Sequence, residues 1–350
     1  MRHQTLICLF LLLLASCQPP LRLSTTEPSL TPPAAVTDTS TPVPSTSTVE
    51  PSATITPQPA LTATPDRSLT PPMTREVAFA YLFMAGQLVA FGGLDPNPGG
   101  CNPCDETWVW WPVDHYWSKS EPAHVPPARS SAAMAYDAAH MTVVLFGGAA
   151  GQQMFDDTWL WDGQDWSQAH PASAPSPRLN ARMTYDYAHD QVVLWGGWYQ
   201  GEGKMDFDFY SDTWTWDGKT WTKHDVSGPR NGLIPPASLA YDDNLKQVVM
   251  WQYGTGLWTW NGAAWRQQPI VNGPDPSTEG QIGFDEIRFH SQLVLRGWTS
   301  ADPSPSAKTW TFDGKTWTLA EDSVISDGNF QDEQIVYTIP FQGLLFITPT

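Results

Sequence analysis

The segment from Trp198 to Asp212 holds the residues whose types and spacing are best suited to bind a ligand. Five aromatic and three acidic residues share it: Trp198, Tyr199, Phe207, Phe209, Tyr210, Glu202, Asp206 and Asp208. Aromatic planes beside carboxylates can stack on a sugar ring and bond its hydroxyl groups. The same rings can instead pack the segment onto neighbouring structure. Both interpretations stay open.

Two further groups of residues have the chemistry of metal ligands. Cys101 and Cys104 form a C-x-x-C pair, but the sequence holds no second such pair to complete a tetrahedral site. In an oxidising compartment this spacing predicts a disulfide that clamps a loop. Asp206 and Asp208 lack the glycine and the closing glutamate of an EF-hand loop, which favours a solvated acidic loop. We therefore expect no metal and no cofactor.

Motifs that signal catalysis are missing from the sequence. It has no HExxH, nucleophile elbow, phosphate-binding loop or dinucleotide fingerprint. The histidines beyond the first few residues are scattered: His115, His124, His140, His170, His189, His224 and His290. No residue is assigned a catalytic role, and a non-enzymatic protein is favoured. An active site assembled from several distant loops stays open as the alternative.

A tryptophan-rich repeat organises most of the chain. Its copies recur about fifty residues apart, a period typical of stacked repeat units. They are DDTWLWDGQDW (156–166), SDTWTWDGKTW (211–221), TGLWTWNGAAW (255–265), AKTWTFDGKTW (307–317) and the looser DETWVWWPVDHYW (105–117). One such unit cannot bury its own apolar faces, so neighbouring units are expected to cover one another.

Each well-preserved copy follows an alternating segment ending in Tyr-Asp and an apolar run ending in Gly-Gly, which together predict four strands per unit. The runs are QLVAFGG (87–93), TVVLFGG (142–148) and QVVLWGG (191–197). Asp-Gly or Asn-Gly then joins the third strand to the fourth, as in a two-residue type I′ turn. That turn predicts cross-strand pairs, listed here: Trp159 with Trp166, Trp214 with Trp221, Trp258 with Trp265, and Trp310 with Trp317.

This pattern of Gly-Gly doublets, tryptophan strands and final tryptophans resembles the kelch-type β-propellers, the superfamily of the galactose oxidase central domain. The resemblance implies an all-β propeller of four-stranded blades. The copies predict five complete blades and a partial sixth, either in a six-bladed ring with a half-built closing blade or in a chain truncated relative to its full gene product. Gln252-Tyr253 and Arg296-Gly297 depart from the doublet, and residues 329–350 supply only two strands. In such blades the loop between strands two and three opens on the face that usually meets ligands.

The resemblance therefore places the candidate ligand-binding residues on that face: Trp198, Tyr199, Asp206, Asp208, Phe209 and Tyr210. We expect a binding module for a protein or a glycan. TWDGKTW (215–221) and TFDGKTW (311–317) are also similar to the structural Asp-box of sialidases, so a carbohydrate-active hydrolase, isomerase or oxidase stays open. Arg129, Arg178 and Arg230 lie near unit starts, where a kelch-like repeat places an arginine for packing or for hydrogen bonds to a loop.

The first residues predict export and anchoring. Residues 1–17 have a basic start, an apolar run and small residues, as in a secretory signal. Leu14, Ala15, Ser16 and Cys17 resemble the bacterial lipoprotein cleavage box, in which the cysteine is acylated. Ordinary cleavage nearby is the alternative. The resemblance implies an extracytoplasmic protein held at a bacterial membrane by its lipid alone.

Composition divides the remainder into a linker and a domain. Residues 18–72 are rich in Thr, Ser and Pro and predict a disordered tether, and residues 73–350 predict the propeller. The formal net charge of −18 argues against nucleic acid and against a surface that binds anionic lipid. We expect a monomer whose partner is a protein or a polysaccharide at the cell surface.

Overall fold

The computed structural model is all-β. It describes residues 67–68, 75–82, 87–111, 116–200, 207–230, 237–285, 292–298, 308–320, 334–338 and 343–347. These residues belong to one compact unit, Ala60–Thr350. Cys17 and the expected signal lie outside the described residues, as does nearly all of the expected linker. No helix in the described part of the chain is long and apolar enough to cross a membrane.

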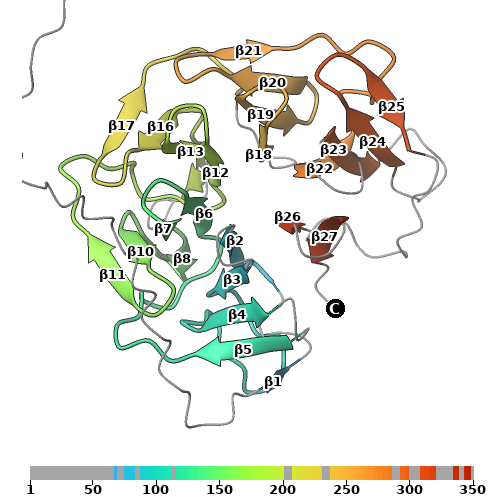
Figure 1. Cartoon of the computed structure of the whole chain (residues 1–350). Coiled ribbons are helices and arrows are strands. Elements are labelled where there is room, and N and C mark those ends of the chain that lie inside the picture. Colours follow the sequence, from blue (N-terminus) through green and yellow to red (C-terminus); the bar gives the residue numbers. More distant parts are fainter. Residues whose placement is uncertain are drawn as a thin grey trace, which may run out of the picture. The chain divides into compact units, whose positions relative to one another are not determined.

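Five antiparallel sheets follow one another along the chain (Figure 1). Sheet 1 contains β1 (Arg67–Ser68), β2 (Ala78–Leu82), β3 (Gln87–Phe91), β4 (Thr107–Trp111) and β5 (Tyr116–Ser120). Sheet 2 contains β6 (Ala133–Asp137), β7 (Thr142–Phe146), β10 (Thr158–Trp161) and β11 (Trp166–Ala169). Sheet 3 contains β12 (Arg182–Asp186), β13 (Gln191–Trp195), β16 (Thr213–Trp216) and β17 (Trp221–His224).

The later strands continue the pattern. Sheet 4 contains β18 (Ser238–Asp242), β19 (Gln247–Gln252), β20 (Gly256–Trp260) and β21 (Trp265–Gln267). Sheet 5 contains β22 (Glu279–Asp285), β23 (Gln292–Trp298), β24 (Lys308–Phe312) and β25 (Trp317–Leu319). Three short pairs are β8 (Ala149–Ala150) with β9 (Gln153–Met154), β14 (Trp198–Tyr199) with β15 (Asp208–Phe209), and β26 (Gln334–Thr338) with β27 (Gly343–Ile347). The four-stranded sheets are consistent with the blades of a propeller.

The predicted register of the tryptophan hairpins was wrong. Trp166 lies opposite Trp161, and Trp159 lies opposite Gln168. The turn holds four residues because Asp162 Oδ1 accepts hydrogen bonds from the amides of Gln164 and Asp165, each at 2.8 Å. The other turns pair Trp216 with Trp221, Trp260 with Trp265, and Phe312 with Trp317.

Consecutive sheets bury each other's faces, as the repeat predicted. In β7, Val143 and Leu145 pack with residues of sheet 1, whereas Val144 and Phe146 pack with residues of sheet 3. An apolar run without polar alternation is therefore buried on both faces. Similar clusters join sheet 3 to sheet 4 and sheet 4 to sheet 5. Strand β26 contacts both β22 and β2.

Indole hydrogen bonds reinforce these contacts between sheets. The last-strand tryptophan of one sheet donates to a threonine of the preceding sheet: Trp166 to Thr107, Trp221 to Thr158, and Trp265 to Thr213, at 2.8–2.9 Å. Sheet 4 has Leu257 where the other sheets have this threonine. The Trp317 Nε1 of sheet 5 is accordingly buried without a hydrogen-bond partner.

A buried aspartate ends the first strand of sheets 2, 3 and 4. Asp137 and Asp186 each bond a histidine three residues later, His140 at 2.9 Å and His189 at 2.8 Å. Asp242 has no such partner because Leu245 occupies the histidine position. Its Oδ1 accepts two backbone amides, but its Oδ2 is buried and unbonded. Burial raises the pKa of Asp242 above its ordinary value.

Asp242→Asn is expected to stabilise the protein at pH 7 by about 1 kcal/mol, since an ionised carboxylate with an unbonded buried oxygen is costly. The folded pKa is the higher one, so folding favours the protonated form. The cost is therefore full above the raised pKa and disappears as the pH falls through it. Urea unfolding at several pH values measures this difference, which should shrink in acid.

Asp137→Asn is the matched control, because it weakens the bond to His140. It should destabilise the protein at pH 7. If Asp242→Asn destabilised the protein equally, the unbonded oxygen would carry no energetic penalty.

Candidate functional site

In sheets 1, 2 and 3, the loop between the second and third strands lies beside the segment that leads into the sheet. Isolated bridges pair Arg75 with Leu94, Ser130 with Ala149, and Leu179 with Trp198. The loop and the entry segment of a sheet therefore share one end of it. This is the end at which the resemblance places ligand contacts.

The β14–β15 hairpin of sheet 3 carries a cluster of aromatic rings. Trp198 pairs with Phe209 across the hairpin. The Phe207 ring meets the Trp198 ring edge-on at 4.9 Å and lies 6.3 Å from the Phe209 ring. Phe207 is 40% exposed, while Trp198, Tyr199 and Phe209 are half-buried. The hairpin thus presents one open aromatic ring on a supporting cluster.

The acidic residues of this segment are only partly located. Asp208 pairs with Tyr199 in the hairpin and is exposed to solvent. Glu202 and Asp206 lie outside the described residues. The described part of the hairpin therefore brings four of the predicted aromatic residues and one carboxylate together.

Tyr210 has a structural contact. Its ring lies 4.2 Å from the guanidinium of Arg178, and its amide donates to the carbonyl of Gly197 at 2.9 Å. Burial is the main cause that raises the pKa of Tyr210. Tyr210 therefore helps to seat the hairpin on sheet 3, and a role in ligand binding stays a prediction.

Arg178 joins the hairpin to the rest of sheet 3. Its Nη1 donates to the carbonyl of Gly196 at 2.9 Å, and its two terminal nitrogens bond both oxygens of Asp212 at 2.7 and 3.2 Å. Burial alone would raise the pKa of Asp212, but the hydrogen bond and charge of Arg178 outweigh it and lower that pKa. Arg178 is about 1% exposed.

Arg129 repeats this arrangement in sheet 2. It bonds Asp157 with both terminal nitrogens, donates to the Gly147 carbonyl and lies over the Phe155 ring at 4.0 Å. Arg230 instead is exposed and accepts a bond from Gln252 through its carbonyl. Because Arg129 and Arg178 are committed to internal carboxylates, they lend no support to a sialidase-like arginine cluster.

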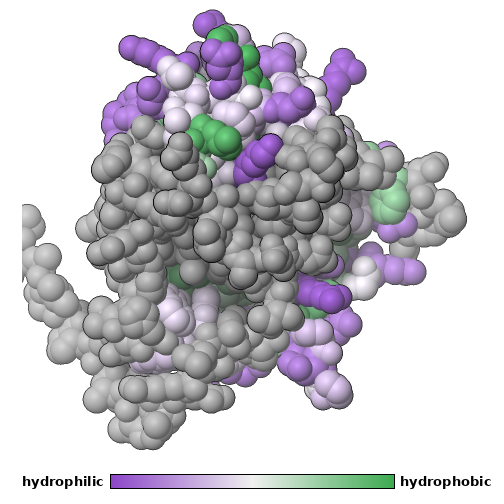
Figure 2. All heavy atoms as spheres, turned by 90° about the vertical axis from the view of Figure 1, so that its right-hand side faces the viewer, coloured by the Kyte–Doolittle hydropathy of each residue, from purple (hydrophilic) through white to green (hydrophobic). Residues whose placement is uncertain are grey.

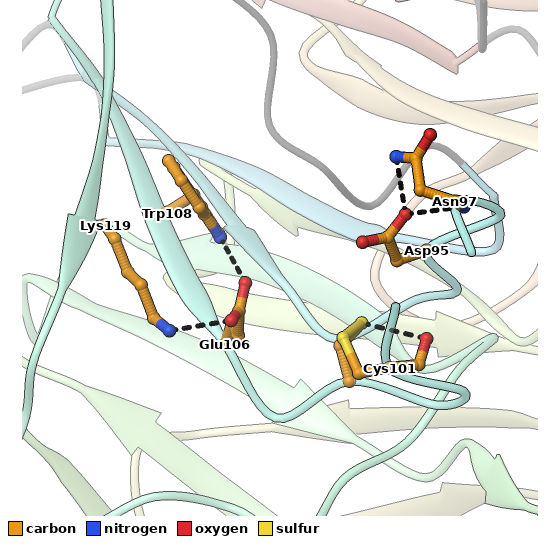
Figure 3. Close-up of a disulfide and its surroundings, with 7 residues drawn as sticks. Asp95, Asn97, Cys101, Glu106, Trp108 and Lys119 are labelled. Carbon is orange, nitrogen blue, oxygen red and sulfur yellow. Dashed lines mark hydrogen bonds and ion pairs between the residues drawn. A yellow bond between two sulfur atoms is a disulfide. The ribbon is translucent and has the colours of Figure 1, made fainter. Parts of the chain in front are cut away.

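A disulfide stands at the matching point of sheet 1 (Figure 3). Cys101 and Cys104 are bonded, with their Cα atoms 4.9 Å apart. The Cys104 amide donates to the Gly93 carbonyl at 2.8 Å, as Tyr210 does to Gly197. Cys104 therefore occupies in sheet 1 the position that Tyr210 occupies in sheet 3. Nearby, Glu106 accepts hydrogen bonds from Trp108 and Lys119 (Figure 3).

Metal-binding clusters are not found among the described residues, where no three His, Cys, Asp or Glu side chains gather suitably. On the face shown in Figure 2, hydrophilic side chains predominate among the coloured atoms, and hydrophobic ones form small separate groups.

One charged residue near the hairpin was missed from the sequence. Arg182 begins β12, at a position occupied by Ala78 in sheet 1, Ala133 in sheet 2 and Ser238 in sheet 4. The sequence signal for Arg182 was a large charged residue at a position where the other copies have a small one. This difference appears only when the copies are aligned strand by strand.

Comparison with known proteins gives no family assignment. No protein-family model matches the chain, and no curated protein sequence matches it.

Proposed function

We propose that this chain is an extracytoplasmic binding module that holds a glycan or a protein ligand at the β14–β15 end of sheet 3. The observation that carries the proposal is the aromatic cluster of Trp198, Phe207 and Phe209, with its half-exposed outer ring. Aromatic rings on a rigid base suit stacking on the apolar face of a sugar. The neighbouring exposed carboxylate of Asp208 can accept bonds from sugar hydroxyls.

We also propose that the sheets form a six-bladed kelch-type propeller. A six-bladed kelch-type propeller would use β26 and β27 as the first two strands of its last blade. The contacts of β26 with β22 and with β2 support this closure. The lipid anchor at Cys17 is supported by the sequence around it alone.

The binding test uses the full chain on arrays of polysaccharides and cell-surface proteins. Trp198→Ala, Phe207→Ala and the combined replacement of Tyr199 and Tyr210 by alanine are compared with the unaltered chain. We expect at least a tenfold loss of affinity for the bound ligand in the first two variants. An aromatic hot-spot residue typically costs about 2 kcal/mol or more when truncated to alanine, and about 1.4 kcal/mol corresponds to a tenfold loss.

Tyr187→Ala is the matched control, because Tyr187 is 48% exposed and lies between β12 and β13, away from the hairpin. It should leave binding unchanged. Hairpin variants that bound as tightly as the unaltered chain would exclude this hairpin as the site.

A further inference from the structure

Arg182 is a half-buried cation for which the described residues supply no counter-ion. Its Nε donates to the carbonyl of Ala237 at 2.8 Å, linking sheet 3 to sheet 4. Within the described residues, nothing accepts a hydrogen bond from its Nη1 or Nη2, and no carboxylate pairs with it. The segment that precedes Ala237, residues 231–236, contains no acidic residue.

Two buried arginines have the counter-ions that the half-buried Arg182 lacks among the described residues. Arg129 and Arg178 each hold an aspartate with both terminal nitrogens. Burial lowers the pKa of Arg182 to about 10, so the side chain still carries its charge at pH 7. A partly desolvated charge without a partner is costly, and the planar guanidinium is shaped to bind a carboxylate with two parallel hydrogen bonds.

Arg182 lies at the hairpin end of sheet 3. Its Cα partner is Trp195, and the bridge between Leu179 and Trp198 lies three residues further along the same pair of chain segments. At the usual rise of a strand, three residues span roughly 10 Å. A ligand of a few sugar units can therefore reach both the guanidinium and the aromatic cluster.

We propose that the two terminal nitrogens of Arg182 bind a carboxylate of an acidic polysaccharide built from uronic acid units. A neighbouring sugar of the same chain would stack on the β14–β15 aromatic cluster. This inference rests on the proposed function and adds the charge class of the ligand. A glycan is favoured over an acidic peptide because the cation and the flat aromatic rings occur at the same end of one sheet.

The test measures calorimetric binding of trigalacturonic acid and of the neutral galactotriose to the full chain. The unaltered protein should bind the acidic trisaccharide at least tenfold more tightly. Arg182→Ala should abolish this preference and leave neutral binding intact. Alanine stands at the matching position in sheets 1 and 2, so the variant should fold. Arg182→Lys should recover only part of the preference, since lysine cannot donate two parallel hydrogen bonds to a carboxylate.

Arg266→Ala is the control for nonspecific charge, because Arg266 is exposed on β21. It should leave the preference unchanged. Equal binding of the two trisaccharides, or a preference that survives in Arg182→Ala, would overturn the inference. Arg182-dependent binding of polyglutamate in place of trigalacturonic acid would overturn it too. If Trp198→Ala lost neutral binding while Arg182→Ala kept the preference, the proposed function would stand and only this inference would fail.

Discussion

Arg178→Met is expected to lower the free energy of unfolding by about 3–5 kcal/mol, the range found when one partner of a buried ion pair is removed. The variant leaves Asp212 half-buried without its cation and removes the donor to the Gly196 carbonyl. It also ends the contact with the Tyr210 ring. Methionine keeps an unbranched apolar stem, so most of the loss comes from the charge and hydrogen bonds.

Urea unfolding of the full chain measures this loss, and Arg182→Met is the matched control. Both variants remove a guanidinium, which is buried in Arg178 and half-buried in Arg182. Arg178 pairs with Asp212, whereas no carboxylate among the described residues pairs with Arg182. The control should cost far less. Asp212→Asn should restore part of the stability of Arg178→Met, because it removes the charge that the first change leaves unpaired. Additive losses in the double variant would show that the pair acts independently.

Sequence reasoning located the strands because their patterns are local. The apolar run of β7 ends at Gly147 and Gly148, and the tryptophan strand β10 follows after a short loop. Repetition then strengthened each assignment, since the same order recurs in sheet 3. Stacking of the sheets followed from the burial that such runs require on both faces.

The hairpin register failed for an equally local reason. Asp162-Gly163 alone indicates a type I′ turn, which needs positive φ at both central residues. In the structure Gly163 has a φ of 100°, and the turn is closed instead by the Asp162 side chain, which accepts two amides further on. The matching segments 215–221 and 311–317 are similar to an Asp-box, and that similarity was the signal that outweighed the dipeptide.

The sequence predicted which residues make up the candidate site but not which contacts they form. Trp198 and Phe209 stood out as aromatic residues in one loop, and the hairpin does pair them. Tyr210 gave the same signal, yet its ring lies on Arg178. Which ring faces solvent depends on partners distant in sequence. That no carboxylate among the described residues pairs with Arg182 likewise depends on residues distant in sequence.

Gly147→Ala should destabilise the protein by about 3 kcal/mol, combining the cost of a left-handed backbone with that of a steric overlap. Gly147 has a φ of 72°. A Cβ there would lie 2.5 Å from the carbonyl oxygen of Arg178, in the entry segment of the next sheet. Backbone cannot rotate away as a side chain can, so the two sheets would have to shift.

Gly163→Ala separates the two causes. Gly163 also has a positive φ, but a Cβ there would meet no atom within 4 Å. Its loss should therefore be limited to the backbone term, about 1–2 kcal/mol. The difference between the variants in thermal or urea unfolding reports the overlap between sheets 2 and 3. Equal losses would mean that the Gly-Gly doublet is required only for its dihedral angles, and that the close approach to Arg178 can relax freely.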